Sequence, residues 1–456
     1  MYILGLLLVF AQGVTDSSVL IGMEGAAQSF SSDEENLGMH IVIRDVNARG
    51  GIHGRKIEAA AYPRDRDNAI EQALANVKRL NEEDRVFLLF NFGGPAAVPI
   101  GAYASANDLP YMFPHTALLT VDGERNVFTS FPRYAGESRM MLRYLVGTVG
   151  AERIAVIHAD NIYGDYFAGR AQELAGETAY TFAGNRALAR FPDDALPEMR
   201  ALREARPDVL IMALYPAGAK AVVEAKAALD WDVRLVSSGP LTDEQYLNID
   251  GGHAEGTLGF CHYPDPNESN VPGIVEYRAL MAEYYPGHEL NRYSLYGYVF
   301  GSLVVEGLVR AGEDLVREHF LDAMESIRDW DSGGILSIVS FSASDHHAQD
   351  AGFICELRNG RFHALSDWLE PIAFRTVSVV PWISPGGPLD CFGPIRVRPE
   401  LPCGVPFLSF LPVSIAVLFV QATTSNCLPT ECRVPGQVRE SSRRRCRGNN
   451  GRESRR

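Results

Sequence analysis

Short apolar runs alternate with longer amphipathic segments along the first part of the chain. The run 17–23 (SSVLIGM) predicts a strand. The segment that begins at Ser32-Asp33-Glu34-Glu35 predicts a helix, because a hydroxyl followed three residues later by Glu is typical of a helix start, and Gly50-Gly51 ends it. The further predicted elements are strands at 55–62, 85–90 and 111–113, and helices at 68–80 and from the break at 93–95 to residue 106.

The alternation restarts after residue 150. Here the predicted strands are 153–158, 207–214 and 234–237, and the predicted helices are 167–175 and 217–229. Strands that alternate with helices of about 10–15 residues are typical of parallel sheets covered on both faces. Two such series predict an α/β protein with two doubly wound parallel-sheet lobes. Ligands bind beyond the carboxyl ends of such strands, so a cleft between two facing lobes is the expected site.

The charge is unevenly distributed along the 456 residues. The whole chain carries −15, which argues against nucleic acid as the main partner, because neutralising phosphates requires a basic face. Residues 376–456 differ: they hold eleven arginines, no lysine and only five acids, and proline recurs throughout. The strand–helix pattern also stops there. We therefore predict an irregular C-terminal tail over 376–456, either disordered or a non-native extension such as a shifted reading frame.

The N-terminal run 2–11 (YILGLLLVFA) is apolar and is followed by small residues. It matches the apolar part of a secretory signal without the basic residues that usually precede it, and a buried first strand is the alternative. The run is too short to span a membrane, which needs about 20 residues. We expect 1–16 to be a signal segment of an exported protein. Cys261 and Cys355 alone, in the first 375 residues, predict no disulfide framework.

The sequence offers no starting point for catalysis. The chain has no G-x-G-x-x-G, Walker A, G-x-S-x-G or H-E-x-x-H pattern. One group of residues could in principle bind a metal: Asp345, His346, His347 and Asp350. All four come from one local segment between strand-like runs, which is more typical of a polar turn. We therefore predict no catalytic residue, no metal and no cofactor.

Several short motifs resemble a known family in their order and spacing. They are residues 47–56 (NARGGIHGRK), 110–114 (PYMFP) with 126–128 (NVF), 163–164 (YG), 206–209 (RPDV) with Tyr215, and 296–298 (YGY). Each motif alone is weak, but they remain collinear from about residue 17 to 370. In this respect the chain resembles the periplasmic solute-binding proteins of branched-chain amino-acid type (leucine/isoleucine/valine-binding-like, type I), which serve ABC importers.

The resemblance implies the type I periplasmic-binding-protein fold, in which two lobes are joined by a three-crossover hinge. Lobe 1 would comprise 17–131 plus 262–338, and lobe 2 would comprise 132–261 plus 339–375. The partners would be a small-molecule ligand and the membrane subunits of an ABC transporter, in the periplasm. By position the resemblance implies these ligand-binding residues: Gly93, Gly94, Pro95, His115, Thr116, Tyr163, Tyr215, Ser238 and Gly239.

The chain departs from the family pattern where the ligand's charges would be held. Gly94 stands where amino-acid-binding members usually place a hydroxyl, and 237–240 (SSGP) stands where they often have an acid for the ligand's ammonium. Backbone N–H groups of the glycine-rich turn could hold a carboxylate. Asp160 and Asp165, which flank Tyr163, could replace the missing acid, although solvated loop acids are the simpler interpretation. An amino acid is the expected ligand, with an amide, a urea-like compound or an aromatic acid as competitors.

The same fold is compatible with a second function. A protein that closes on its ligand could be a sensor and regulator of amides or amino acids instead of a transport component. A DNA-binding repressor of related fold is disfavoured, because no helix-turn-helix precedes residue 17 and the first 375 residues are acidic.

Overall fold

The computed structural model describes residues 12–24, 30–63, 69–117, 124–247, 249 and 254–370, which belong to one compact unit, Met1–Thr376. Most of the predicted signal segment and the whole predicted tail lie outside the described residues. None of the described helices is long and apolar enough to cross a membrane.

The first half of the described chain builds a parallel sheet with strand order β2-β1-β3-β4-β5. Its elements are β1 (Ser18–Glu24), α1 (Phe30–Ala48), β2 (Lys56–Tyr62), α2 (Ala69–Glu82), β3 (Leu88–Phe90), the short turn η1 (Gly94–Ala96), α3 (Ala97–Ala106), β4 (Tyr111–Met112) and β5 (Val127–Phe128). Later helices join them: α9 (Pro272–Tyr284), α10 (Arg292–Ala311) and α11 (Arg317–Glu325).

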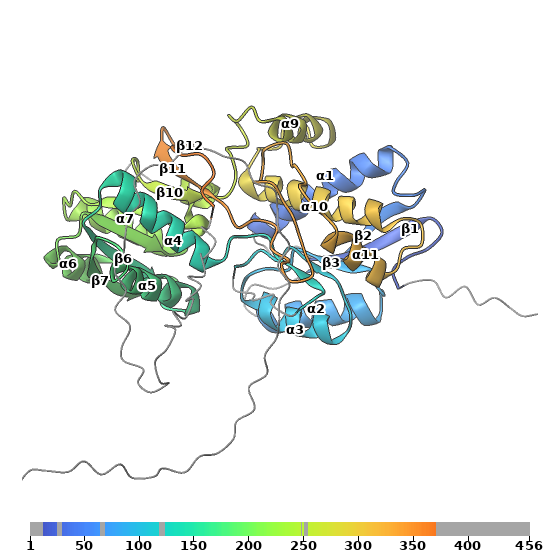
Figure 1. Ribbon diagram of the computed structural model, residues 1–456, viewed down its shortest axis with the longest axis horizontal. Coiled ribbons are helices and arrows are strands. Elements are labelled where there is room, and N and C mark those ends of the chain that lie inside the picture. Colours follow the sequence, from blue (N-terminus) through green and yellow to red (C-terminus); the bar gives the residue numbers. More distant parts are fainter. Residues whose placement is uncertain are drawn as a thin grey trace, which may run out of the picture. The chain divides into compact units, whose positions relative to one another are not determined.

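Side chains of this sheet alternate between two cores, because successive residues of a strand point to opposite faces. Leu88 and Phe90 lie in the core shared with α1 and α10, whereas Leu89 between them lies in the core shared with α2 and α3. Helices therefore cover both faces (Figure 1).

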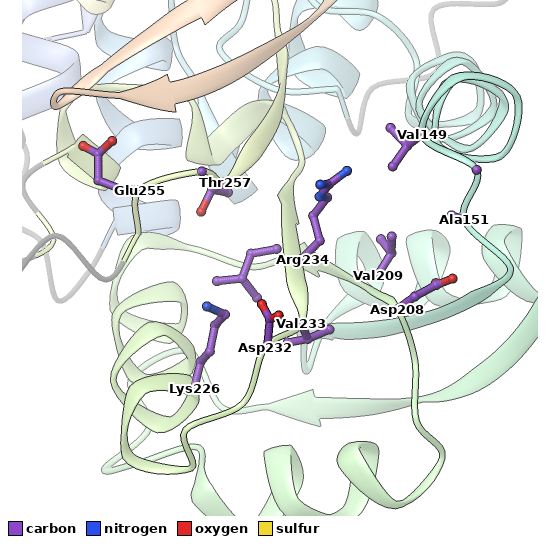
Figure 2. Close-up of a pocket in the computed structure, with 13 residues that line it drawn as sticks. Val149, Ala151, Asp208, Val209, Lys226, Asp232, Val233, Arg234, Glu255 and Thr257 are labelled. Carbon is purple, nitrogen blue, oxygen red and sulfur yellow. The ribbon is translucent and has the colours of Figure 1, made fainter.

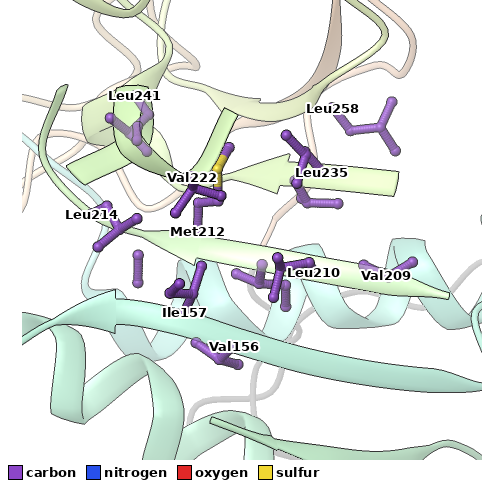
Figure 3. Packing of buried hydrophobic residues seen from close by; sticks show 14 of the residues in the cluster. Val156, Ile157, Val209, Leu210, Met212, Leu214, Val222, Leu235, Leu241 and Leu258 are labelled. Atoms are coloured by element: carbon purple, nitrogen blue, oxygen red, sulfur yellow. The ribbon is translucent and has the colours of Figure 1, made fainter. Parts of the chain in front are cut away.

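The second sheet has the order β12-β11-β10-β9-β8-β6-β7. Its elements are α4 (Tyr134–Tyr144), η2 (Leu145–Val149), β6 (Arg153–Ala159), α5 (Ile162–Ala175), β7 (Thr181–Leu188), α6 (Leu196–Glu204), β8 (Val209–Ala213), α7 (Pro216–Ala228), β9 (Arg234–Ser237), η3 (Gly239–Leu241), α8 (Glu244–Leu247), β10 (Leu258–Cys261), β11 (Phe353–Arg358) and β12 (Arg361–Ala364). Its core holds Ile157, Leu210 and Met212 on neighbouring strands, with Val222 of α7 packed on them (Figure 3). The strands β6 to β10 pair in parallel, whereas β11 and β12 join antiparallel.

The chain passes between the two sheets three times: between β5 and α4, between β10 and α9, and between α11 and β11. The predicted α/β fold with two doubly wound, mainly parallel sheets is thus confirmed. Phe341, on the third passage, packs against Phe113 and Phe128 of the first half, whereas β11 pairs with β10. The residue boundaries of the two lobes stay a prediction.

The disulfide of this structure was not predicted, because two isolated cysteines, Cys261 and Cys355, give no disulfide framework in the sequence. The two cysteines are joined by a disulfide between β10 and β11, and both are buried. They are 94 residues apart in sequence and become neighbours only because the third passage returns the chain beside β10. Sequence spacing alone does not contain that information.

Candidate ligand-binding site

Two loops meet at the carboxyl edge of the first sheet and carry the first group of predicted site residues. The Gly94 N–H donates a hydrogen bond to the His115 carbonyl at 3.2 Å, and a Cβ atom on Gly93 would come within 2.8 Å of the His115 Cβ. Gly94 has φ +63° and open space around it, so this turn favours glycine for its backbone conformation. Pro95 lies in the short turn that follows, and Thr116 is buried.

His115 forms an ion pair with a residue that the sequence analysis did not select. Its Nδ1 lies 2.5 Å from Oε1 of Glu35, a buried residue of α1, while the His115 side chain itself is 35% exposed. Asn91 donates to the other Glu35 oxygen. Burial lowers the pKa of His115, but the charges of Glu35, Asp243 and Glu24 outweigh that effect and raise the pKa overall.

The second group of predicted residues lies at the carboxyl ends of β6, β8 and β9. Asn161 begins α5: its side-chain oxygen accepts from the Tyr163 N–H at 3.1 Å, and its amide donates to the Tyr215 hydroxyl at 3.4 Å. The buried hydroxyls of Tyr163 and Ser238 share a hydrogen bond, and the rings of Tyr163 and Tyr215 are 5.8 Å apart. Burial raises the pKa of Tyr163 well above its usual value, so its hydroxyl stays protonated.

Gly239 lies against a second acid–histidine pair. Its N–H donates to Oε1 of Glu137 on α4 at 2.8 Å, and a Cβ atom at Gly239 would overlap the ring of His262. Oε2 of Glu137 lies 3.7 Å from Nε2 of His262. Glu137 is fully buried and His262 nearly so. Glycine is therefore required at residue 239 for space.

Two aromatic residues, Phe131 on the first passage and Tyr134 at the start of α4, connect the two groups. The ring of Phe131 is 4.6 Å from that of His115 and 5.2 Å from that of His262. Tyr134 lies 4.8 Å from Tyr163 and also hydrogen-bonds the backbone of Ala117, the residue after Thr116. The structure thus brings the predicted residues of both halves into one cluster.

Sequence reasoning missed six residues of this cluster: Glu35, Asn91, Phe131, Tyr134, Glu137 and His262. One signal was available for Glu137, which lies on the same helical face as Met140 and Met141 and is an acid on an apolar stripe. By contrast, Asp160 and Asp165, the acids considered as replacements, are exposed. Among the described residues, no three His, Cys, Asp or Glu side chains are grouped to hold a metal ion.

A cavity of about 510 Å³ lies at the opposite edge of the second sheet, where β6, β8, β9 and β10 begin (Figure 2). Lys226, Asp232 and Arg234 contribute charges of both signs. The Asp208 carboxylate is already bound by the backbone N–H groups of Glu152 and Arg153. This cavity contains none of the predicted site residues and no aromatic ring, so the carboxyl edge, where the predicted residues gather, stays the candidate ligand site.

Two α/β halves with loops that meet in one cluster are the architecture of a ligand-binding protein, with the cluster as its candidate site. The chain belongs to the periplasmic binding protein family, whose model matches residues 18–361. It is similar to a Leu/Ile/Val-binding protein homolog 7 from Brucella abortus (strain 2308), with 24% identity over 297 residues that cover 60% of this chain and 72% of that protein.

Solved structures share the fold at lower identity. A branched-chain amino acid ABC transporter protein from Thermus thermophilus, with bound valine, matches with TM-score 0.69 and 15% identity over 80% of this chain and 99% of that one. A fatty acid ABC transporter substrate-binding protein from Thermomonospora curvata matches with TM-score 0.69 and 18% identity over 79% and 94%. Their names give different ligands, so the shared fold does not determine what is bound.

Proposed function

We propose that this protein is the periplasmic solute-binding component of an ABC importer. It would hold an amino acid or a related small carboxylate or amide between its two halves and deliver it to the membrane subunits. The observation that carries the proposal is the convergence of loops from both sheets: Phe131 joins His115 to His262, and Tyr134 joins Tyr163 to the Ala117 backbone. A ligand that touches both halves favours the closed state by its differential affinity.

Two further observations support export and transport. Disulfides persist mainly in oxidising compartments such as the bacterial periplasm, and Cys261 and Cys355 form one. The names of the similar proteins refer to the binding of branched-chain amino acids and, in one solved structure, to a fatty acid transporter. The N-terminus of protein from its native host separates import from sensing: a mature start near Thr15 supports import, and an intact Met1 or Tyr2 supports a sensor.

A melting screen over amino acids, short amides, urea and aromatic acids tests the binding function. A ligand at about 100 times its Kd should add about 2.7 kcal/mol to the free energy of unfolding and raise Tm. Tyr215→Ala should weaken binding of that ligand by about 1–3 kcal/mol, through lost ring packing and a lost hydroxyl partner.

Tyr144→Ala provides the matched control. Tyr144 is also a partly buried tyrosine of the second half, but it lies at the far end of α4, about 15 Å from Tyr134 by helix geometry. Its replacement should leave the affinity unchanged. If no compound raises Tm, or if a ligand binds equally well to Tyr215→Ala, the proposed site is wrong.

A further inference from the structure

The first and third passages between the two sheets lie side by side. The Thr129 N–H donates to the His346 carbonyl at 3.0 Å, and the Thr129 carbonyl accepts from the Ala348 N–H at 2.9 Å. These backbone bonds bring the His347 side chain beside Arg133, the last residue before α4. A contact between these two side chains therefore connects the third passage to the start of a helix that carries part of the candidate site.

The His347 side chain is almost completely buried between a guanidinium and a carboxylate. Its Nδ1 lies 2.8 Å from Nη2 of Arg133 and 3.1 Å from Oδ1 of Asp345. A guanidinium can only donate, so the shorter contact requires a lone pair on Nδ1 and places the ring proton of neutral His347 on Nε2. Oδ1 of Asp345 also accepts from the His347 backbone N–H at 3.3 Å, which accounts for its position near the ring.

Three charged groups act on the His347 ring: Arg133 from the first passage, and Asp345 and Asp350 from the third. Nitrogens of the Arg133 guanidinium lie 3.6 Å from Oδ1 of Asp345 and 3.8 Å from Oδ2 of Asp350. Burial and the charge of Arg133 lower the pKa of His347, and the two acids offset this only in part. His347 is therefore neutral at neutral pH and can accept from Arg133.

A proton on Nδ1 turns this contact from attraction into repulsion. The imidazolium carries an N–H on both nitrogens and has no acceptor, so Nδ1 can still donate to Asp345 but can no longer accept from Arg133. Two like charges at hydrogen-bond distance in a largely buried position are unfavourable. Arg133 then has to move away from the ring.

A displacement of Arg133 reaches the candidate site within the first turn of α4. The Arg133 carbonyl accepts from the Glu137 N–H at 3.0 Å, and Glu137 in turn accepts from Gly239. Tyr134, the next residue along the chain, lies 4.8 Å from Tyr163. The side of the cluster that α4 carries is thus held in place directly beside the Arg133–His347 contact.

We propose that His347 is a proton-sensitive link between the first and third passages. Neutral His347 holds Arg133 and the start of α4, whereas acidification protonates Nδ1, releases Arg133 and loosens the α4 side of the candidate site. The proposal goes beyond the solute-binding function and does not depend on which ligand is bound.

Hydrogen exchange of the unmodified full chain tests the link, after correction for the pH dependence of the intrinsic exchange rates. We expect protection of residues 129–142 to fall by about tenfold between about pH 7 and about pH 5. His347→Gln keeps a side-chain acceptor that does not titrate, so its protection should stay constant. His319→Gln is the control, because this histidine is exposed on α11 and contacts the Asp314 carbonyl; it should leave the acid response unchanged.

Two variants of charged neighbours should move the acid response in opposite directions. Arg133→Gln removes the cation that disfavours protonated His347, so the midpoint of the His347 titration should rise by about one pH unit. Asp350→Asn removes an acid that favours the protonated ring, so the midpoint should fall by about the same amount. Nitrogen NMR of histidine-labelled protein measures the midpoint and the tautomer, and the His347 signals are those that disappear in His347→Gln.

Each outcome decides for or against the link. If His347→Gln does not fold, a single histidine signal that moves in opposite directions in Arg133→Gln and Asp350→Asn still identifies His347 and supports the proposal. A protonated Nδ1 at neutral pH, an acid response that persists in His347→Gln, or one that disappears in Asp350→Asn would overturn it. The melting screen tests solute binding separately, so failure of the link leaves the proposed function intact.

Discussion

The ion pair of the buried Glu35 and the partly exposed His115 joins α1 to the loop after β4, with 2.5 Å between His115 Nδ1 and Glu35 Oε1. Around it, charges from Glu24 and Asp243 act in the same direction and raise the pKa of His115 despite its burial. A histidine whose folded pKa exceeds its unfolded value of about 6.5 binds its proton more tightly in the folded state. Its contribution to stability is therefore fully present below that unfolded value and is lost as the pH rises through the folded pKa.

Glu35→Gln removes the main favourable charge and should reveal this pH dependence. We expect the unmodified protein to be more stable than the variant by the largest margin below the unfolded value of about 6.5, and the margin to shrink as the pH rises through the raised pKa of His115. Urea unfolding at a series of pH values measures both free energies. A margin that stays constant or grows with pH would contradict the assignment of the pair.

Glu35 also illustrates what the residue pattern could not predict. The sequence assigns it to a helix start together with Ser32, but α1 begins at Phe30, so both residues lie inside the helix and are buried. Its partner, His115, is 80 positions away and on another element. Local patterns describe the helix correctly and give no information on which buried acid meets which histidine.

At the scale of elements, α1 and α10 pack closely through two glycines. A Cβ on Gly38 of α1 would overlap the carbonyl oxygen of Ser294, and one on Gly297 of α10 would overlap that of Glu35. These contacts are with backbone atoms, which cannot move aside as a flexible side chain can. The close approach also fixes the position of Glu35 beneath the candidate site.

Gly38→Ala and Gly297→Ala should each lower the free energy of unfolding by about 1–3 kcal/mol, because overpacking forces the two backbones apart. Gly169→Ala is the control within α5, where no atom lies within 4 Å of the added Cβ and helix propensity favours alanine by up to about 1 kcal/mol. Thermal and urea unfolding measure all three. If Gly38→Ala and Gly297→Ala both have the same Tm as the unmodified protein, α1 and α10 are not packed in this way.

The elements differ in how well sequence predicts them. β9 is confirmed at Arg234–Ser237. A short apolar run is the usual pattern of a short buried strand, and the sequence has such a run there. β7 (Thr181–Leu188) was not predicted because it is the edge of the second sheet, half exposed and without an apolar run. The antiparallel β11 and β12 also escaped prediction, because they follow no strand–helix alternation.

At the scale of the whole molecule, the alternation of strands and helices predicts both sheets, and the rule that ligands bind at carboxyl ends of strands predicts where the cluster lies. The three passages and the individual site residues were expected only from the resemblance to the solute-binding family. Phe131, Glu137 and His262 fall outside that rule. They lie on or beside the passages between the sheets, where neighbours are set by how the two halves pack. That packing is a property of the complete fold and has no local signature.

The disulfide between Cys261 and Cys355 joins the two ends of the segment that leaves the second sheet after β10 and returns to it as β11. Between the two cysteines the chain leaves the second sheet, contributes α9, α10 and α11 to the first half, and returns as β11. A cross-link across 94 residues restricts the unfolded chain strongly, and removal of a native disulfide typically costs about 2–5 kcal/mol.

The double variant Cys261→Ala/Cys355→Ala should lose stability in this range, measured by urea unfolding. Reductant should lower the stability of the unmodified protein by the same amount and leave that of the double variant unchanged, while peptide mapping of the exported protein should recover the linked Cys261–Cys355 peptide. Equal stability of the two proteins in the absence of reductant, or two free thiols at these positions after export, would contradict the role of this disulfide in holding the returning strand beside β10.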